Sequence, residues 1–203
     1  ALGSLWMACQ PIVRAADRSL HGHEALLRSE ERALPHPGAV LDAAERLGRL
    51  PELGRKVRDT AAAAAGLATA RGDLFVNLHS RDLADDSLVD PGAPLSRVAS
   101  RVVLEVTERA TLEDVPNVRE RVAALRALGF RIAVDDLGAG YAGLTTFAVL
   151  EPDVVKLDMS LVRGADSEPA HGDLEGRNKA AALLAAVPAG RRMSAKRKAS
   201  QNY

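Results

Sequence analysis

The chain has 203 residues, of which 47% are hydrophobic and 27% are charged, a balance typical of a folded globular protein and not of a disordered one. Its 27 basic and 27 acidic residues give a net charge of zero, which excludes the basic excess of a dedicated nucleic-acid binder. A single cysteine excludes a disulfide framework, and no apolar run approaches the roughly 18 residues of a membrane span. We therefore expect a cytoplasmic domain with no membrane segment and no nucleic-acid partner.

The first third of the chain predicts one buried strand followed by two helices. Leu5–Val13 is mostly apolar and predicts the strand, whereas residues 38–47 and 53–70 predict the helices. A proline separates the two helices, and five consecutive alanines favour the second one. Between the strand and the helices, we interpret His21 and His23 as solvated residues of a turn.

The remainder of the chain alternates strands with helices. Short apolar runs predict strands over residues 74–78, 102–106, 130–134 and 154–157. Apolar residues recur at helical spacing over residues 115–128, with a proline near the start and a glycine just past the end. Apolar strands separated by helices indicate a parallel sheet covered by helices. An open doubly wound sheet and a closed α/β barrel both fit this pattern.

Polar side chains accompany the carboxyl ends of the predicted strands. They are Glu24, Asn77, Glu105, Asp135, Asp136 and Lys156. In an α/β barrel the carboxyl ends of the strands form the rim on which active sites are assembled. Carboxylate and amide oxygens are the ligands that Mg²⁺ and Mn²⁺ prefer, and two adjacent aspartates allow one carboxylate to bridge two ions. A two-metal site of this kind suggests in-line attack on a phosphate ester.

Each of these polar residues also has an ordinary structural interpretation. Glu105 is compatible with a strand end and a helix cap, and Lys156 with an exposed lysine. Asp135 and Asp136 are compatible with a turn in which their side chains accept hydrogen bonds from backbone amides. We interpret His79, close to the candidate Asn77, as a bystander or as a residue that supports a ligand.

Five blocks of sequence follow one another in a fixed order over residues 5–163. They are Gln10-Pro11-Ile12-Val13 with His23-Glu24-Ala25-Leu26-Leu27-Arg28, Phe75-Val76-Asn77-Leu78, Leu104-Glu105-Val106-Thr107-Glu108, Asp135-Asp136-Leu137-Gly138-Ala139-Gly140-Tyr141, and Pro152-Asp153-Val154-Val155-Lys156-Leu157-Asp158. In order and spacing these blocks resemble the EAL domain family, bacterial signalling phosphodiesterases that hydrolyse cyclic di-GMP to linear pGpG. The resemblance implies an α/β fold, a variant (β/α)8 barrel of the TIM type.

The resemblance also implies a pair of divalent ions, Mg²⁺ or Mn²⁺, at the rim of the barrel. The residues that match the family's metal ligands are Glu24, Asn77, Glu105, Asp135 and Asp136. Asp135 would bridge the two ions, and Asp136 would complete the shell of the second. A hydroxide between the ions would attack phosphorus, and the ions would stabilise the developing charge.

Four further residues match family positions with other roles. Lys156 would be catalytic, binding or orienting the attacking water. Gln10 and Arg28 would contact cyclic di-GMP, and the guanidinium of Arg28 suits a phosphate oxygen. Glu108 would anchor a mobile loop that the family uses in dimerisation and activation. A homodimer and an upstream sensory or GGDEF-type domain are therefore candidate partners.

The resemblance ends near residue 164. We expect an EAL-like barrel portion over residues 1–164 and an irregular, basic tail over residues 165–203. Residues 154–157 would be about the sixth strand of eight, so the last two, with a general-base glutamate and a guanine-contacting glutamine, are expected to be missing. Residues 191–203 hold five basic and no acidic residues, which leaves a net charge of −5 on residues 1–190. A truncation, a frameshift and a basic binding patch are three open explanations of the tail.

Two classes of function remain open for the chain. The matching metal ligands favour a metal-dependent cyclic di-GMP phosphodiesterase. The missing general base favours a degenerate EAL-like domain that acts as a cyclic di-GMP receptor or a protein-interaction module without turnover. In either case, replacing Glu24 by Gln is expected to abolish metal-dependent binding or cleavage.

Overall fold

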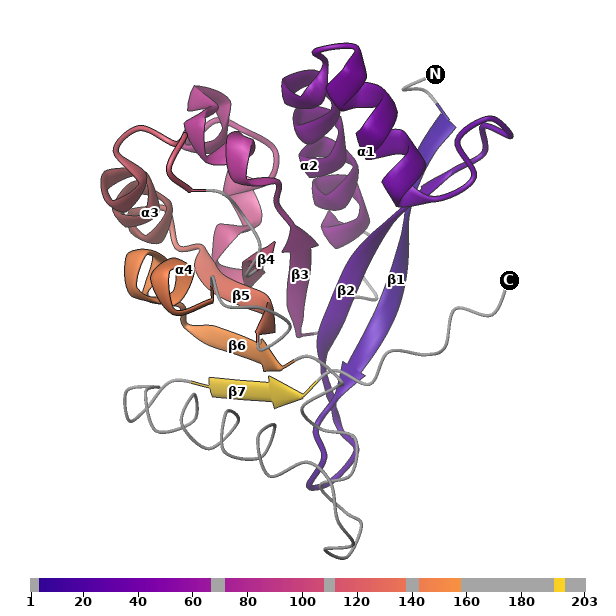
Figure 1. Cartoon of the computed structure of the whole chain (residues 1–203). Coiled ribbons are helices and arrows are strands. Elements are labelled where there is room, and N and C mark those ends of the chain that lie inside the picture. The colour runs from indigo at the N-terminus through magenta and orange to yellow at the C-terminus, as the bar shows by residue number, and fades with distance from the viewer. Residues whose placement is uncertain (1–3, 67–71, 108–111, 138–142, 158–191, 196–203) are drawn as a thin grey trace, which may run out of the picture. The chain divides into compact units, whose positions relative to one another are not determined.

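The structure, a computed structural model, describes residues 4–66, 72–107, 112–137, 143–157 and 192–195 (Figure 1). The chain divides into two compact units. Unit 1 comprises Ala1–Glu105 and Thr111–Arg131, and unit 2 comprises Val106–Ala110 and Ile132–Tyr203.

Four strands pair in chain order in unit 1. They are β1 (Leu5–Val13), β2 (Leu20–Ser29), β3 (Asp73–Asn77) and β4 (Val102–Thr107), the last two residues of which belong to unit 2. The strand predicted over Leu5–Val13 is confirmed with its bounds, but the prediction that it is buried is wrong, since Leu5 is its only buried residue. The predicted parallel arrangement is confirmed for β2, β3 and β4, whereas β1 runs antiparallel to β2.

A short loop over residues 14–19 explains the antiparallel hairpin, because parallel strands need a much longer crossover. The Asp17 carboxylate closes this loop by accepting hydrogen bonds from the Ser19 amide at 2.9 Å and the Ser19 hydroxyl at 2.7 Å. Arg18 adopts a left-handed backbone conformation with φ 58°. The interpretation of His21 and His23 as turn residues is therefore wrong: the loop closes before them, and both lie in β2.

The two predicted helices of unit 1 are confirmed as α1 (Pro37–Arg46) and α2 (Leu50–Gly66). The side chain of His36 caps α1 by accepting a hydrogen bond from the Ala39 amide at 3.1 Å. Both helices pack on each other and on the β1–β2 hairpin (Figure 1). Val40 of α1 and Leu53 of α2 form a buried cluster with Leu5 of β1, so the apolar side of each helix faces the strands.

A buried arginine on α2 holds the connection between β3 and β4, which consists of the 3-10 helices η2 (Ser80–Ala84), η3 (Asp86–Leu88) and η4 (Ser96–Arg101). Arg58 contacts the carboxylates of Asp82 at 3.1 Å and Asp85 at 2.6 Å. Burial raises the pKa of Asp82, and the charge of Arg58 offsets this only in part. Burial also acts to raise the pKa of Asp85, but hydrogen bonds from Arg55 and Ser87 outweigh it and hold that pKa well below its usual range.

Unit 2 contains parallel strands and one described helix. Helix α3 (Val118–Ala127) of unit 1 leads into β5 (Arg131–Leu137), which continues into unit 2 and is followed by α4 (Gly143–Leu150), β6 (Val154–Leu157) and β7 (Arg192–Ala195). β6 pairs in parallel with both β5 and β7. β7 lies in the segment for which the sequence predicts an irregular tail. Its four residues contain no apolar run, so its backbone pairing with β6 is a long-range effect that the local sequence does not predict.

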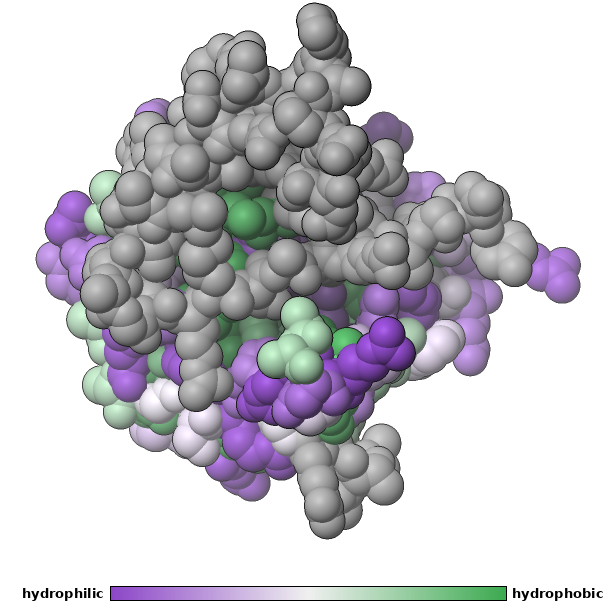
Figure 2. All heavy atoms as spheres, turned by 90° about the horizontal axis from the view of Figure 1, so that it is seen from below, coloured by the Kyte–Doolittle hydropathy of each residue, from purple (hydrophilic) through white to green (hydrophobic). Residues whose placement is uncertain are grey.

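The strands of both units carry fully buried apolar side chains. Phe75 and Val103 in unit 1, and Ile132 and Val134 in unit 2, are each 0% exposed. On the face shown in Figure 2, hydrophilic residues cover much of the described surface and hydrophobic residues lie among them. Among the described residues, no helix has the length and apolar character needed to cross a membrane.

Candidate functional site

Glu24 lies inside β2, a strand that the sequence does not predict. In the pairing register it stands opposite Gln10 of β1 on one side and Phe75 of β3 on the other. Its residue is only 2% exposed. A carboxylate buried this deeply is costly unless charged or hydrogen-bonding groups surround it, so its position points to a bound or paired state.

Asn77 and Glu105 are brought together by the parallel pairing of β3 and β4. They are directly opposite each other in the register. The amide of Leu78 donates a hydrogen bond to the Glu105 carbonyl at 2.8 Å, which continues the ladder past the end of β3. Asn77 closes β3 and is exposed, whereas Glu105 is 1% exposed. One amide and one buried carboxylate therefore share the carboxyl end of two neighbouring strands.

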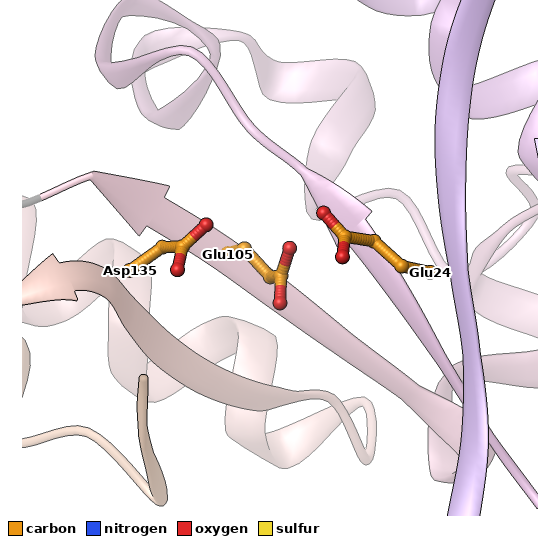
Figure 3. A group of neighbouring side chains, drawn as sticks. All are labelled: Glu24, Glu105 and Asp135. Carbon is orange, nitrogen blue, oxygen red and sulfur yellow. The ribbon is translucent and has the colours of Figure 1, made fainter. Parts of the chain in front are cut away.

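The carboxylates of Glu24 and Glu105 approach each other within unit 1. Each offers an oxygen, and these oxygens lie within 4.8 Å of one another. Figure 3 shows both side chains, Glu24 from β2 and Glu105 from β4. Two negative charges this close in a buried setting repel each other strongly, and a cation bound by both removes the repulsion.

The donors of unit 1 fit a hard divalent cation. Carboxylate oxygens with a nearby amide oxygen are the ligand set of Mg²⁺, Mn²⁺ and Ca²⁺, not of Zn²⁺ in its sulfur- and imidazole-rich sites. The short separation of the two glutamate oxygens allows both to reach one ion. The observed pair is therefore compatible with the metal that the sequence predicts.

Unit 2 has a buried carboxylate of its own, Asp135 of β5, which is 5% exposed and is drawn in Figure 3. Its Oδ2 forms an ion pair with Nζ of Lys156 on β6 at 3.1 Å. Its Oδ1 accepts a hydrogen bond from the backbone amide of Asp136 at 2.9 Å. Lys156 is 2% exposed, which overturns the alternative that it is a solvent-exposed lysine. The strand pairing thus brings together the predicted catalytic lysine and a predicted metal ligand.

Three predicted site residues remain, of which two lie on the β1–β2 hairpin. Gln10 faces Glu24 across the antiparallel pair, and its residue is half-buried. Arg28 lies four positions after Glu24 on β2, about 13 Å along the strand, and its guanidinium donates to the carbonyl of Leu27 at 2.8 Å. Glu108 lies outside the described residues. The prediction that Glu108 anchors a loop is therefore not tested.

Phe75 is not among the site residues predicted from the sequence, although it lies between them. It faces Glu24 in the register and precedes Asn77 by two positions, so its ring is on the same face of β3 as the Asn77 amide. At 0% exposed, it is a fully buried apolar residue next to Glu24 in the strand register. The two-residue spacing to Asn77 is the sequence signal that indicates this position.

Buried carboxylates on parallel strands thus form a candidate site for a divalent cation. The chain matches the family model described as EAL domain over residues 1–176. This chain therefore belongs to the EAL domain family.

Curated and solved relatives agree with this assignment. The bifunctional diguanylate cyclase/cyclic di-GMP phosphodiesterase MucR of Pseudomonas aeruginosa is 34% identical over 197 residues, which cover 92% of this chain and 28% of MucR. The chain thus spans less than a third of the length of this relative.

Two solved structures show the same fold. The PaMucR phosphodiesterase in complex with c-di-GMP has a TM-score of 0.71 and 30% identity, covering 90% of this chain and 79% of that chain. The manganese/cy-diGMP complex of Klebsiella pneumoniae BlrP1 at pH 9.0 has a TM-score of 0.64 and 29% identity, covering 79% and 42%. The predicted fold class, an α/β chain with the parallel strands of a TIM-barrel-like EAL domain, is confirmed.

Proposed function

We propose that this chain is a metal-dependent phosphodiesterase that hydrolyses cyclic di-GMP to linear pGpG. The observation that carries the proposal is the pair of buried carboxylates, Glu24 and Glu105, with oxygens within 4.8 Å of one another. Family membership and the c-di-GMP complexes of the neighbours support the choice of substrate.

The proposed ligands are the residues that match the metal ligands of the EAL family. Glu24, Asn77, Glu105 and Asp135 would hold one divalent ion, Mg²⁺ or Mn²⁺. Asp135 would also contact a second ion, with Asp136 as its further ligand. When bound, such ions lower the pKa of a coordinated water and neutralise charge on the phosphate. The protein supplies the fixed donors and, through side chains such as Phe75, a low-dielectric surrounding.

Lys156 would act in two ways in this site. Its ammonium group, 3.1 Å from Asp135, fixes one oxygen of that carboxylate and compensates its buried charge. The same positive charge would orient the attacking water and stabilise negative charge that develops on the phosphate. Lys156 is only 2% exposed, so solvent screens its positive charge little and both roles are strengthened.

Gln10 and Arg28 would contact cyclic di-GMP from the β1–β2 hairpin. Gln10 lies directly opposite Glu24, so a ligand near the ion would pass its amide. Arg28 lies four positions after Glu24 on the same strand, so both side chains start from one face of β2. Glu108 would anchor the loop after Asp136.

The context of the whole protein is also a proposal. A cytoplasmic location, a homodimer and an upstream sensory or GGDEF-type domain fit a second-messenger phosphodiesterase. The MucR relative is named as a bifunctional cyclase and phosphodiesterase.

The proposal is tested by the affinity for Mn²⁺, measured calorimetrically on the full chain. Glu24→Gln and Glu105→Gln each keep the shape of the side chain and remove its charge. Loss of a residue that only supports a metal ligand weakens metal binding by roughly 10- to 100-fold. Each of these substitutions removes a ligand itself, so we expect each to weaken Mn²⁺ binding by more than that.

The matched control for this measurement is Glu120→Gln, the same change at an exposed position of α3. It is expected to leave Mn²⁺ affinity as in the wild type. Equal affinity in all four proteins would refute the assignment of the site.

A further inference from the structure

The pairing of β5 with β6 contains one extra residue on β5. Val134 pairs with Val155 and Leu137 pairs with Leu157, so Asp135 and Asp136 together oppose the single residue between those partners on β6. This is a β-bulge, which is uncommon between parallel strands and is over-represented next to active sites. The residue that faces the bulge is Lys156.

The bulge coincides with an unusual backbone conformation at Asp136. Its φ is +55°, in the left-handed region. Among the described residues, three other non-glycine residues have positive φ, namely Arg18, Asn117 and Glu151, and none of these lies within a strand. Aspartate and asparagine tolerate this region better than other residues with a side chain.

The bulge changes which side chains share a face. In a regular strand Asp135 would share its face with Leu137, because side chains alternate. Because of the extra residue, Val134 still pairs with Val155 and Leu137 with Leu157. Asp135 and Asp136 therefore both lie opposite Lys156. The bulge thus explains how two consecutive residues of one strand can both serve one site.

The left-handed residue also holds its neighbour directly. Its amide donates a hydrogen bond to Oδ1 of Asp135 at 2.9 Å, while Lys156 contacts Oδ2 at 3.1 Å. Both oxygens of Asp135 therefore have a fixed partner within unit 2, and one of the two partners is the backbone of the bulge. The direction of that amide is fixed by the peptide plane that joins the two aspartates, and the positive φ of Asp136 lets the strand return to register with β6 after this plane.

We propose that Asp136 is a positioning residue, which aims the carboxylate of Asp135 through the left-handed backbone of the bulge, in addition to any role of its own carboxylate. This inference rests on the proposed function, because Asp135 is taken there as a ligand of the divalent ion.

Three substitutions at one position separate the backbone from the carboxylate. Asp136→Asn, Asp136→Gly and Asp136→Ala all remove the negative charge, but asparagine and glycine adopt positive φ readily and alanine does not. Because asparagine keeps an oxygen donor and glycine does not, the decisive comparison is between the Gly and Ala variants, both of which lack a donor. The Ala variant is expected to bind roughly 5- to 30-fold more weakly than the Gly variant, because binding must restore the disfavoured conformation.

Thermal unfolding of the same proteins distinguishes positioning from a merely structural role. A structural role would lower the melting temperature of the Ala variant and leave its Mn²⁺ affinity equal to that of the Gly variant, which would overturn the inference. Should the Ala variant not fold, Asp136→Ser takes its place, since serine also disfavours positive φ. Failure of the wild type to bind Mn²⁺ would instead overturn the proposed function, so the two failures are distinguishable.

Discussion

At the scale of single residues, several charged side chains of this chain are almost fully buried. Glu24, Glu105, Asp135 and Lys156 are each no more than 5% exposed. Burial of an isolated charge is costly, so such residues persist where partners or ions compensate them. The ion pair of Lys156 with Asp135 is one such compensation, and its loss has a measurable consequence.

Replacing Lys156 by methionine is expected to lower the free energy of unfolding by about 3–5 kcal/mol, because the carboxylate of Asp135 loses its charged partner in a buried setting. Urea denaturation of the metal-free chain measures this change. Lys56→Met, a less buried lysine on α2, serves as the control and is expected to change the free energy by less than about 1 kcal/mol. Similar losses in both variants would argue against the buried ion pair.

The pairing of Asp85 with α2 predicts a pH dependence. The pKa of Asp85 is lowered in the folded chain, so its contribution to stability is present above the unfolded pKa of about 3.9 and is lost as the pH falls toward the folded pKa. We expect Asp85→Asn to be less stable by about 1–3 kcal/mol at pH 7. The difference from the wild type is expected to shrink below about pH 4.

Urea denaturation of both proteins between pH 3 and pH 7 checks this prediction. The pKa of Asp82 is raised, so its contribution to stability changes with pH in the opposite direction to that of Asp85. Asp82 is present in both proteins, and its contribution therefore largely cancels in the difference between them. A difference that grows as the pH falls would contradict the assignment of Asp85 as the stabilising partner.

At the scale of elements, the close approach of α2 to η2 depends on a glycine. A Cβ added to Gly54 would collide with the carboxylate of Asp82. Alanine is the better helix former by about 1 kcal/mol, yet we expect Gly54→Ala to destabilise the chain by about 1–3 kcal/mol, because the collision displaces the partner of Arg58. Thermal and urea unfolding measure the change.

Gly66, at the end of the same helix, provides the matched control, because a Cβ there meets nothing within 4 Å. Gly66→Ala is expected to be neutral or slightly stabilising. A Gly54→Ala variant as stable as Gly66→Ala would show that α2 can move away from Asp82 at little cost.

The same scale shows which elements the sequence predicts. β1, β3, β4, β5 and β6 are apolar runs, and their patterns predict them with small errors at the ends. β2 is not predicted, because Gly22 and two histidines interrupt its run of apolar residues. That glycine is explained only by the folded chain, since a Cβ there would collide with the carbonyl of Asp73 on β3.

At the scale of the whole molecule, the order of five sequence blocks predicts the family, and the family model confirms it over residues 1–176. The blocks also predict the ligand types, because a hard cation requires oxygen donors. They do not predict the bulge at Asp136 or the burial of Lys156, since both arise from pairing between strands that are distant in sequence. The boundary at residue 164 stays a prediction.

The central claim is that this chain cleaves cyclic di-GMP with the help of a divalent ion held by Glu24. The most direct measurement incubates the wild type and Glu24→Gln with cyclic di-GMP and Mn²⁺ and separates the products by chromatography. Linear pGpG formed by the wild type, dependent on Mn²⁺ and reduced at least about 100-fold in Glu24→Gln, is the predicted result. A folded wild type that binds cyclic di-GMP without forming pGpG would contradict the claim and identify a receptor instead.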